Sequence, residues 1–143
     1  MPRKLFVNVP VADLRRSIEF FSALGFSFDP QFTDEHATCM LVSDDAAFML
    51  LTRSRFADFT AKPIADPTTA IHAIYCISAD TRDDVDHVVD VALASGGAAA
   101  NPAMDHGFMY GRSFYDPDGH LWEVVWMDPS ALEREAPAHA ASA

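Results

Sequence analysis

Residues 112–126 read RSFY, DPDG and HLWEVVW in succession, and this stretch decides the fold. Its central residues, Asp116 to Gly119, have the chemistry of a β-turn, because Pro presets φ at the second position and Gly tolerates a positive φ at the fourth. Aromatic and β-branched residues, which favour strands, lie on both sides. The stretch therefore predicts the β-hairpin that closes the fold.

Glu123 is a single carboxylate inside the second strand of this hairpin. Because strand side chains alternate between faces, Glu123 shares a face with Leu121 and Val125. A charged group among large apolar residues is either paired with an opposite charge or used in function. The identity of the residue opposite Glu123 therefore decides between a structural and a functional role.

Two registers of the hairpin give Glu123 different neighbours. If Tyr115 pairs with His120 across the turn, Arg112 lies opposite Glu123 and the two form a cross-strand ion pair. A one-residue bulge in the turn places Ser113 there instead. A carboxylate without an ion-pair partner could act as a general base or as a metal ligand.

Length and composition restrict the classes of protein that fit. The chain has 143 residues, half of them hydrophobic, which suits one domain with a substantial core. A net charge of −11 disfavours nucleic acids and anionic membrane surfaces as partners. Cys39 and Cys76 lie far apart and predict reduced thiols in a cytoplasmic protein. No run reaches the roughly 18 apolar residues of a membrane helix.

The first half of the chain predicts a strand, a helix, a strand, a hairpin and a connector. Asp13 caps the helix, because its side chain can accept hydrogen bonds from the free N–H groups of the first turn, and Gly25 ends it. The ranges expected for these elements are 5–11, 13–25, 26–32, 38–42 with 48–52, and 53–66.

The second half repeats this order. A strand is expected at 69–78, a helix from 81 that ends at 95–97, a short strand at 98–100, and the closing hairpin of 107–115 with 120–126. Each module alone buries only one sheet face, so the two must pair. We predict one fused domain, with a first module at 1–60, a second at 61–128, and a flexible tail at 129–143.

The duplicated βαβββ order resembles the vicinal oxygen chelate superfamily, which includes glyoxalase I, the bleomycin-resistance proteins and the extradiol dioxygenases. The motifs that carry the resemblance are VADL at 11–14, SIEFF at 17–21, LGF at 24–26, ASGG at 94–97 and DPDGHLWE at 116–123. They are most similar to glyoxalase-like members named as lactoylglutathione lyases. The resemblance implies an α+β fold in which two tandem βαβββ modules form a cupped mixed β-sheet with helices outside. It also implies a homodimer.

The resemblance implies a divalent metal held by four strand residues, two from each module. At the matching positions, the second module keeps His72 and Glu123. In the first module these positions are Phe6 and, at or near the second, Leu50, and neither has a donor atom. The predicted metal ligands are therefore a partial set, and Glu123 is also the candidate catalytic residue.

The apolar replacements allow two interpretations. Phe6, Phe48 and Leu50 are either core residues or the walls of a ligand pocket inside the curved sheet. In the second case, polar contacts to a small-molecule ligand would come from Asn8, Tyr110 and Arg112. The resemblance favours the pocket for Phe6 and Leu50.

Two functions therefore stay open. The first is a glyoxalase-like lyase or isomerase that acts on a small oxygenated or thiol-adduct substrate, with Glu123 moving a proton. The second is a metal-free protein of the bleomycin-resistance type that binds and sequesters a small molecule. His72 and Glu123 favour the enzyme, whereas Phe6 and Leu50 favour the binding protein.

Overall fold

The structure, a computed structural model, describes residues 3–131. Most of the predicted tail, residues 132–143, lies outside this range. The chain divides into two compact units: unit 1 comprises Met1–His72 and Pro117–His120, and unit 2 comprises Ala73–Asp116 and Leu121–Ala143. The predicted modules assign residues 61–72 to the second half, whereas this division counts them with the first.

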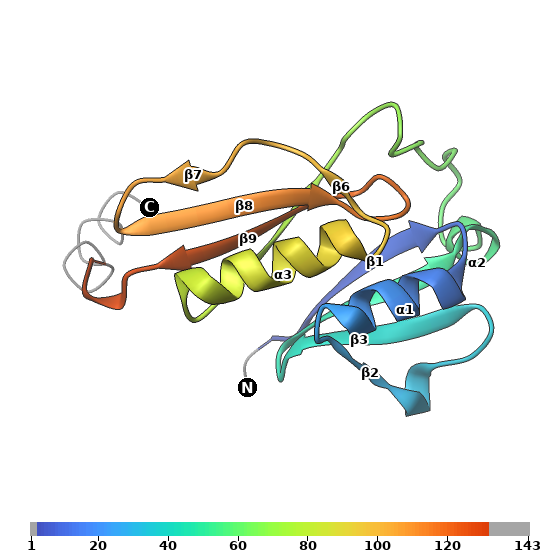
Figure 1. The fold of residues 1–143 in the computed structure, drawn as a ribbon. Helices are drawn as coiled ribbons and strands as arrows, with labels where there is room; N and C mark the ends of the chain where they lie inside the picture. Colours follow the sequence, from blue (N-terminus) through green and yellow to red (C-terminus); the bar gives the residue numbers. More distant parts are fainter. Residues whose placement is uncertain (1–2, 132–143) are drawn as a thin grey trace. The chain divides into compact units, whose positions relative to one another are not determined.

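Unit 1 contains a four-stranded mixed sheet in the order β1-β4-β3-β2 (Figure 1). β1 runs parallel to β4, and the other neighbours are antiparallel. The elements are β1 (Leu5–Val11), α1 (Leu14–Ala23), β2 (Ser27–Asp29), the 3₁₀ helix η1 (Pro30–Phe32), β3 (Ala37–Ser43), β4 (Ala46–Thr52) and α2 (Arg53–Ala57). As predicted, the Asp13 side chain caps α1 by accepting from the Arg16 N–H.

One face of this sheet packs into the core with α1. The helix buries Leu14, Ser17, Phe20 and Phe21. The sheet contributes side chains that are at most 8% exposed, and these are Val9, Val11, Met40, Phe48 and Leu50. Phe6, Asn8 and Met49 alternate with them and belong to the opposite, open face.

Unit 2 contains a five-stranded mixed sheet in the order β5-β9-β8-β6, with β7 also paired to β8. Its elements are β5 (Ile74–Ser78), α3 (Arg82–Ala94), β6 (Ala98–Ala99), β7 (Met104–Asp105), β8 (Met109–Tyr115) and β9 (Leu121–Met127). Figure 1 shows α3 lying along β8 and β9. The buried residues on the two sides are Val85, Val89 and Ala92 of the helix, and Phe114, Trp122 and Val124 of the sheet.

The predicted α+β class is confirmed, with one mixed sheet in each unit. The predicted strand at 69–78 begins only at Ile74. The first part of this strand prediction is wrong, because Asp66 forms a turn just at its start. The Asp66 backbone carbonyl accepts from the Thr69 N–H, and the Asp66 side chain accepts from the Thr68 N–H. In residues 3–131 no helix has the length and apolarity needed to cross a membrane.

Three residues of the DPDG turn and the histidine that follows it, Pro117–His120, are part of unit 1. Asp118 Oδ1 accepts from the Ala12 N–H at 2.8 Å and from Arg16 Nη2 at 3.3 Å. His120 Nε2 lies 2.8 Å from the Pro10 carbonyl oxygen. The turn that the sequence predicts therefore also supplies packing and hydrogen bonds to the start of α1.

Candidate functional site

The register of the closing hairpin places Ser113, not Arg112, opposite Glu123. Tyr115 pairs with Leu121 rather than with His120, so the connection is one residue longer than in the ion-pair alternative. Arg112 lies opposite Val124, on the other face of the sheet. Of the two registers that the sequence allowed, the structure therefore has the one with Ser113 opposite Glu123, and the Arg112–Glu123 ion pair of the other register does not form.

Glu123 lies half-buried on the open face of the unit 2 sheet, with Cys76 beside it on β5. The Ser113 hydroxyl is engaged elsewhere, because it accepts from the Asn101 N–H at 2.8 Å. Within residues 3–131, the Glu123 carboxylate makes no hydrogen bond or ion pair. Desolvation, and then the nearby Glu123 carboxylate, raise the pKa of the exposed Cys76 thiol. Among the residues that the structure describes, the site thus combines a carboxylate without an ion-pair partner with a thiol whose pKa is raised.

Arg112 and Tyr110 belong to a charged network on the α3 face. Arg112 Nη1 donates to Asp86 at 3.0 Å and to Asp90 at 2.9 Å, and the Tyr110 hydroxyl donates to Asp86 at 2.6 Å. The Tyr110 and Arg112 hydrogen bonds lower the pKa of Asp86, with the Tyr110 bond the larger cause. The predicted pocket contacts Tyr110 and Arg112 therefore have partners on the side of the sheet opposite Glu123.

Phe6 and Asn8 lie on the open face of unit 1, as a pocket role requires, and Phe6 is 55% exposed. Phe48 and Leu50 lie on the opposite face, where Leu50 is 0% exposed. The structure therefore places Phe48 and Leu50 in the core, against the pocket role that was predicted for them and that the resemblance favoured for Leu50.

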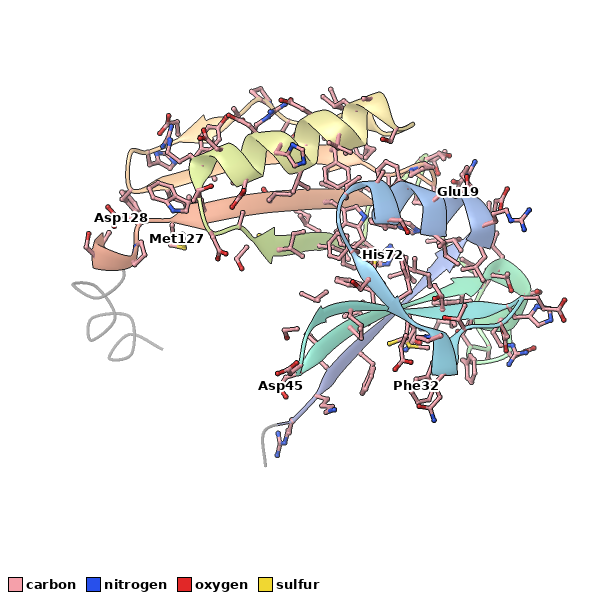
Figure 2. All side chains as sticks on the ribbon, turned by 60° about the horizontal axis from the view of Figure 1, so that its bottom comes forward. Glu19, Phe32, Asp45, His72, Met127 and Asp128 are labelled. Atoms are coloured by element: carbon pink, nitrogen blue, oxygen red, sulfur yellow. The ribbon has the colours of Figure 1, made fainter. Side chains whose placement is uncertain are left out.

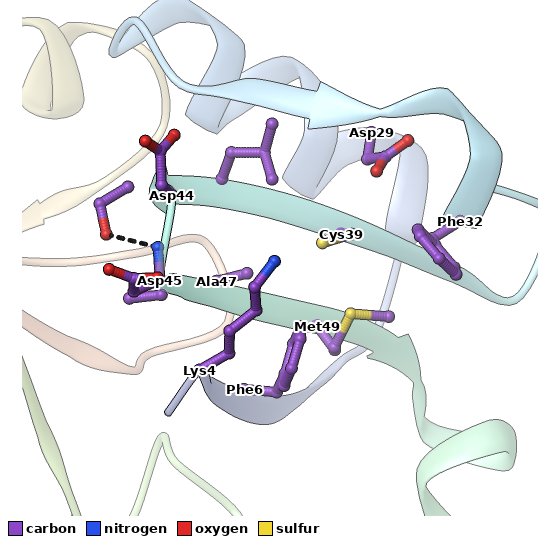
Figure 3. A pocket seen from close by; sticks show the side chains of 12 residues that line it. Lys4, Phe6, Asp29, Phe32, Cys39, Asp44, Asp45, Ala47 and Met49 are labelled. Atoms are coloured by element: carbon purple, nitrogen blue, oxygen red, sulfur yellow. Dashed lines mark hydrogen bonds between the residues drawn. The ribbon is translucent and has the colours of Figure 1, made fainter. Parts of the chain in front are cut away.

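The open face of unit 1 carries a cavity of about 440 Å³ (Figure 3). We call it the acidic pocket. Its apolar lining is Phe6, Phe32, Cys39, Leu41, Ala47 and Met49, and its polar lining is Lys4, Asp29, Ser43, Asp44 and Asp45. In Figure 3, Asp44 and Asp45 lie at one end of the β3–β4 hairpin, and Asp29 lies beside Phe32 at the other. Asn8 lines two adjacent hollows of about 410 and 550 Å³.

Local hydrogen bonds build the two ends of the acidic pocket. Asp29 Oδ1 accepts from the Gln31 N–H at 2.9 Å and so caps η1, the short helix that ends with Phe32. At the other end, the Asp45 N–H donates to Ser43 Oγ at 3.2 Å within the β3–β4 turn. Desolvation, and then the Asp29 charge, raise the pKa of the buried Cys39 thiol.

The donor set does not fit the metal centre that the resemblance implies. Phe6 and Leu50 offer no ligand atom, and no group of three or more His, Cys, Asp or Glu residues able to hold a metal occurs among residues 3–131. His72 is exposed, belongs to unit 1 and precedes β5 (Figure 2). Glu123 belongs to unit 2. A shared metal role for His72 and Glu123 stays a prediction.

Sequence reasoning missed most of the acidic pocket. The sequence indicates Phe6, but it places Phe32, Cys39 and Met49 only in strands, and Ser43 to Ala46 only between the two strands of a hairpin. The sequence indicates which side chains of β3 and β4 share a face, because strand side chains alternate. It does not indicate the parallel pairing of β1 with β4, which brings Phe6 onto the same surface as these side chains.

Comparison with known proteins agrees with this fold. The model of the Glyoxalase/Bleomycin resistance protein/Dioxygenase superfamily matches residues 5–124, and the chain belongs to that superfamily. No curated protein sequence matches the chain.

Solved structures with the same fold have low sequence identity to the chain. A hypothetical protein from S. aureus is 24% identical with a TM-score of 0.73, covering 88% of this chain and 95% of that one. A lactoylglutathione lyase from Agrobacterium tumefaciens is 15% identical with a TM-score of 0.63, covering 88% and 94%. A fosfomycin resistance protein from Mesorhizobium loti is 14% identical with a TM-score of 0.61, covering 92% and 94%.

Proposed function

We propose that this protein binds an apolar or aromatic small molecule in the acidic pocket, without a metal ligand from the first half of the chain. The observation that carries the proposal is the pocket itself, which Phe6 lines together with Met49 and Phe32. The resemblance implies that Phe6 stands at the position of a family metal ligand. A volume of about 440 Å³ lies within the range of small-molecule sites. The superfamily to which the chain belongs includes bleomycin-resistance proteins, the class to which this proposal assigns the chain.

The exposed rings of the pocket explain why a ligand would bind. Phe6 is 55% exposed and Phe32 is 57% exposed, although both lie on an apolar surface. Covering such rings removes apolar area from water at about 25 cal/mol per Å². A flat aromatic ligand can also pack edge-to-face or offset-stacked against them, which adds about 0.5–1.5 kcal/mol per ring pair.

Binding of naphthylmethanol, measured by calorimetry in the presence of a chelator, tests this proposal. Phe6→Ala should raise the dissociation constant about tenfold, equivalent to about 1.4 kcal/mol. The matched control is Phe59→Ala, because Phe59 is 74% exposed and lines the adjacent hollows but not the acidic pocket. A Phe6→Ala variant that binds as well as wild type, or binding that requires added divalent metal, would contradict the proposal.

A second function, a glyoxalase-like lyase or isomerase, is favoured by one observation. Glu123 makes no ion pair in the described part of the chain, so its carboxylate is available to move a proton. The similarity to a lactoylglutathione lyase supports this alternative. Formation of lactoylglutathione from methylglyoxal and glutathione, lost in Glu123→Gln, would establish it. We expect no such turnover with added zinc, nickel or cobalt, because two of the four ligand positions lack donors.

We also propose that the protein is a homodimer, as its resemblance implies. Large apolar side chains remain exposed in both units, including Leu5 at 60% and Ile74 at 54%. Light scattering should give twice the chain mass of 15.7 kDa.

A further inference from the structure

The acidic pocket combines an apolar floor with an excess of negative charge. Three aspartates, Asp29, Asp44 and Asp45, line it together with one lysine, Lys4. Their formal charges sum to −2. We propose that the ligand of this pocket is an organic cation, a protonated amine attached to an aromatic or apolar body. This inference rests on the proposed binding function and adds the class of ligand to it.

The carboxylates at the turn end of the pocket are not paired with a cation in the described part of the chain. Neither Asp44 nor Asp45 forms an ion pair with any residue in the range 3–131, and Lys4 forms none either. Asp45 is held in place through its backbone, because its carbonyl oxygen accepts from the Leu5 N–H at 2.7 Å. Its side chain therefore stays available to accept hydrogen bonds from an ammonium group, which are stronger than those between neutral groups.

The end of the pocket at Asp29 and Phe32 also has a carboxylate beside apolar surface. Asp29 uses Oδ1 to cap η1, and its charge is felt inside the pocket, since it contributes to the raised pKa of Cys39. Phe32, next to Asp29 in Figure 3, presents an exposed ring. A cation over an aromatic face is attracted by the ring quadrupole. A ligand lying along the β3–β4 hairpin would thus find carboxylates at both ends and hydrocarbon between them.

The charge balance argues against an anionic ligand. Lys4 can offset one carboxylate, but an anion in the pocket would still meet two like charges, which lowers its affinity. The net charge of the whole chain, −11, adds a long-range field that attracts cations and repels anions. The pocket therefore selects ligands by charge as well as by apolar contact.

Three ligands that share one ring system test this inference: naphthylmethylamine, naphthylmethanol and naphthoic acid. We expect calorimetry at pH 7 and low salt to show that the amine binds about tenfold tighter than the alcohol, and the acid more weakly than both. The double variant Asp44→Asn/Asp45→Asn should bring the amine close to the alcohol and leave the alcohol unchanged. High salt should weaken the amine selectively, because it screens charge.

A control variant separates local from global charge. Asp80→Asn/Asp83→Asn changes the net charge by the same amount outside the pocket and should leave the preference for the amine intact. Should the double variant at the turn fail to fold, Asp29→Asn provides the same test, because asparagine can still cap η1. If the amine and the alcohol bind equally, the cation inference fails and the proposed function stands. If none of the three ligands binds, the proposed function itself fails.

Discussion

Charged side chains on the unit 2 sheet divide into paired and unpaired groups according to the face they occupy. On the α3 face, Arg82 donates to both carboxylate oxygens of Asp105, and its guanidinium lies 4.4 Å from the centre of the Tyr110 ring. On the open face, Glu123 has no such partner among the described residues. Paired charges of the first kind stabilise the unit, whereas an unpaired carboxylate is a candidate for function.

The Arg82–Asp105 pair gives a prediction on pH. The Arg82 hydrogen bonds, followed by that of the Gly107 N–H, lower the pKa of Asp105 to about 2. Because this folded-state value is below the usual 3.8, the pair stabilises the fold above about pH 4, and this contribution is lost as pH falls through about 2. A carboxyl-carbon NMR titration should show the low pKa, and Arg82→Gln should raise it.

Asp86 is the internal control for this titration. The Tyr110 hydroxyl is the main cause of its lowered pKa and Arg82 the smallest, so Arg82→Gln should move Asp86 much less than Asp105. An ordinary Asp105 pKa in the wild-type protein would show that the ion pair does not form in solution.

Turns and caps set the boundaries of the elements. Gly25, after α1, and Gly119, in the β8–β9 turn, both have a positive φ, at 103° and 97°. They differ in surroundings. A Cβ at Gly25 would meet nothing within 4 Å, whereas one at Gly119 would lie 3.2 Å from the Pro67 carbonyl oxygen.

This difference predicts unequal costs for the same substitution. Gly25→Ala should lower the free energy of unfolding by about 1 kcal/mol, the cost of placing alanine at a positive φ. Gly119→Ala should cost about 1 kcal/mol more, because the rigid backbone at Pro67 must also shift. Urea unfolding of both variants against wild type measures this, and equal losses would show that the close approach to Pro67 is absent.

The sequence predicted features that depend on residues close together in the chain, such as helix caps. It missed features that depend on the pairing of strands far apart in the chain. Asp13 was recognised as a cap because its partner lies three residues away. His72 was placed in a strand because its neighbours are apolar, yet Asp66 forms a turn just before it. Phe6 was recognised as a candidate pocket residue, but its neighbours across the sheet, such as Ala47, follow from a parallel register that no local pattern specifies.

At the scale of the whole molecule, unit 1 is discontinuous in sequence. Its first 72 residues are joined by Pro117–His120, which come from the connection between β8 and β9. The Asp118 side chain is only 7% exposed and lies at the start of α1, where it accepts from Ala12, Arg16 and Ser17. Unit 1 therefore contains contacts between residues about 100 positions apart in the sequence. Such long-range contacts are expected to make unit 1 fold more slowly than a unit whose contacts are all between nearby residues.

Asp118 is the residue through which this long-range dependence can be measured. Asp118→Ala would leave the Ala12 N–H without its acceptor, and we expect the free energy of unfolding to fall by about 2 kcal/mol. Asp118→Asn is the matched control, because its amide oxygen can still accept from Ala12 while the charge facing the half-exposed Arg16 is lost. This should cost less than about 1 kcal/mol. Urea unfolding distinguishes the two variants. Equal stabilities of the alanine variant and wild type would mean that the turn does not hold α1, and that unit 1 is complete without Pro117–His120.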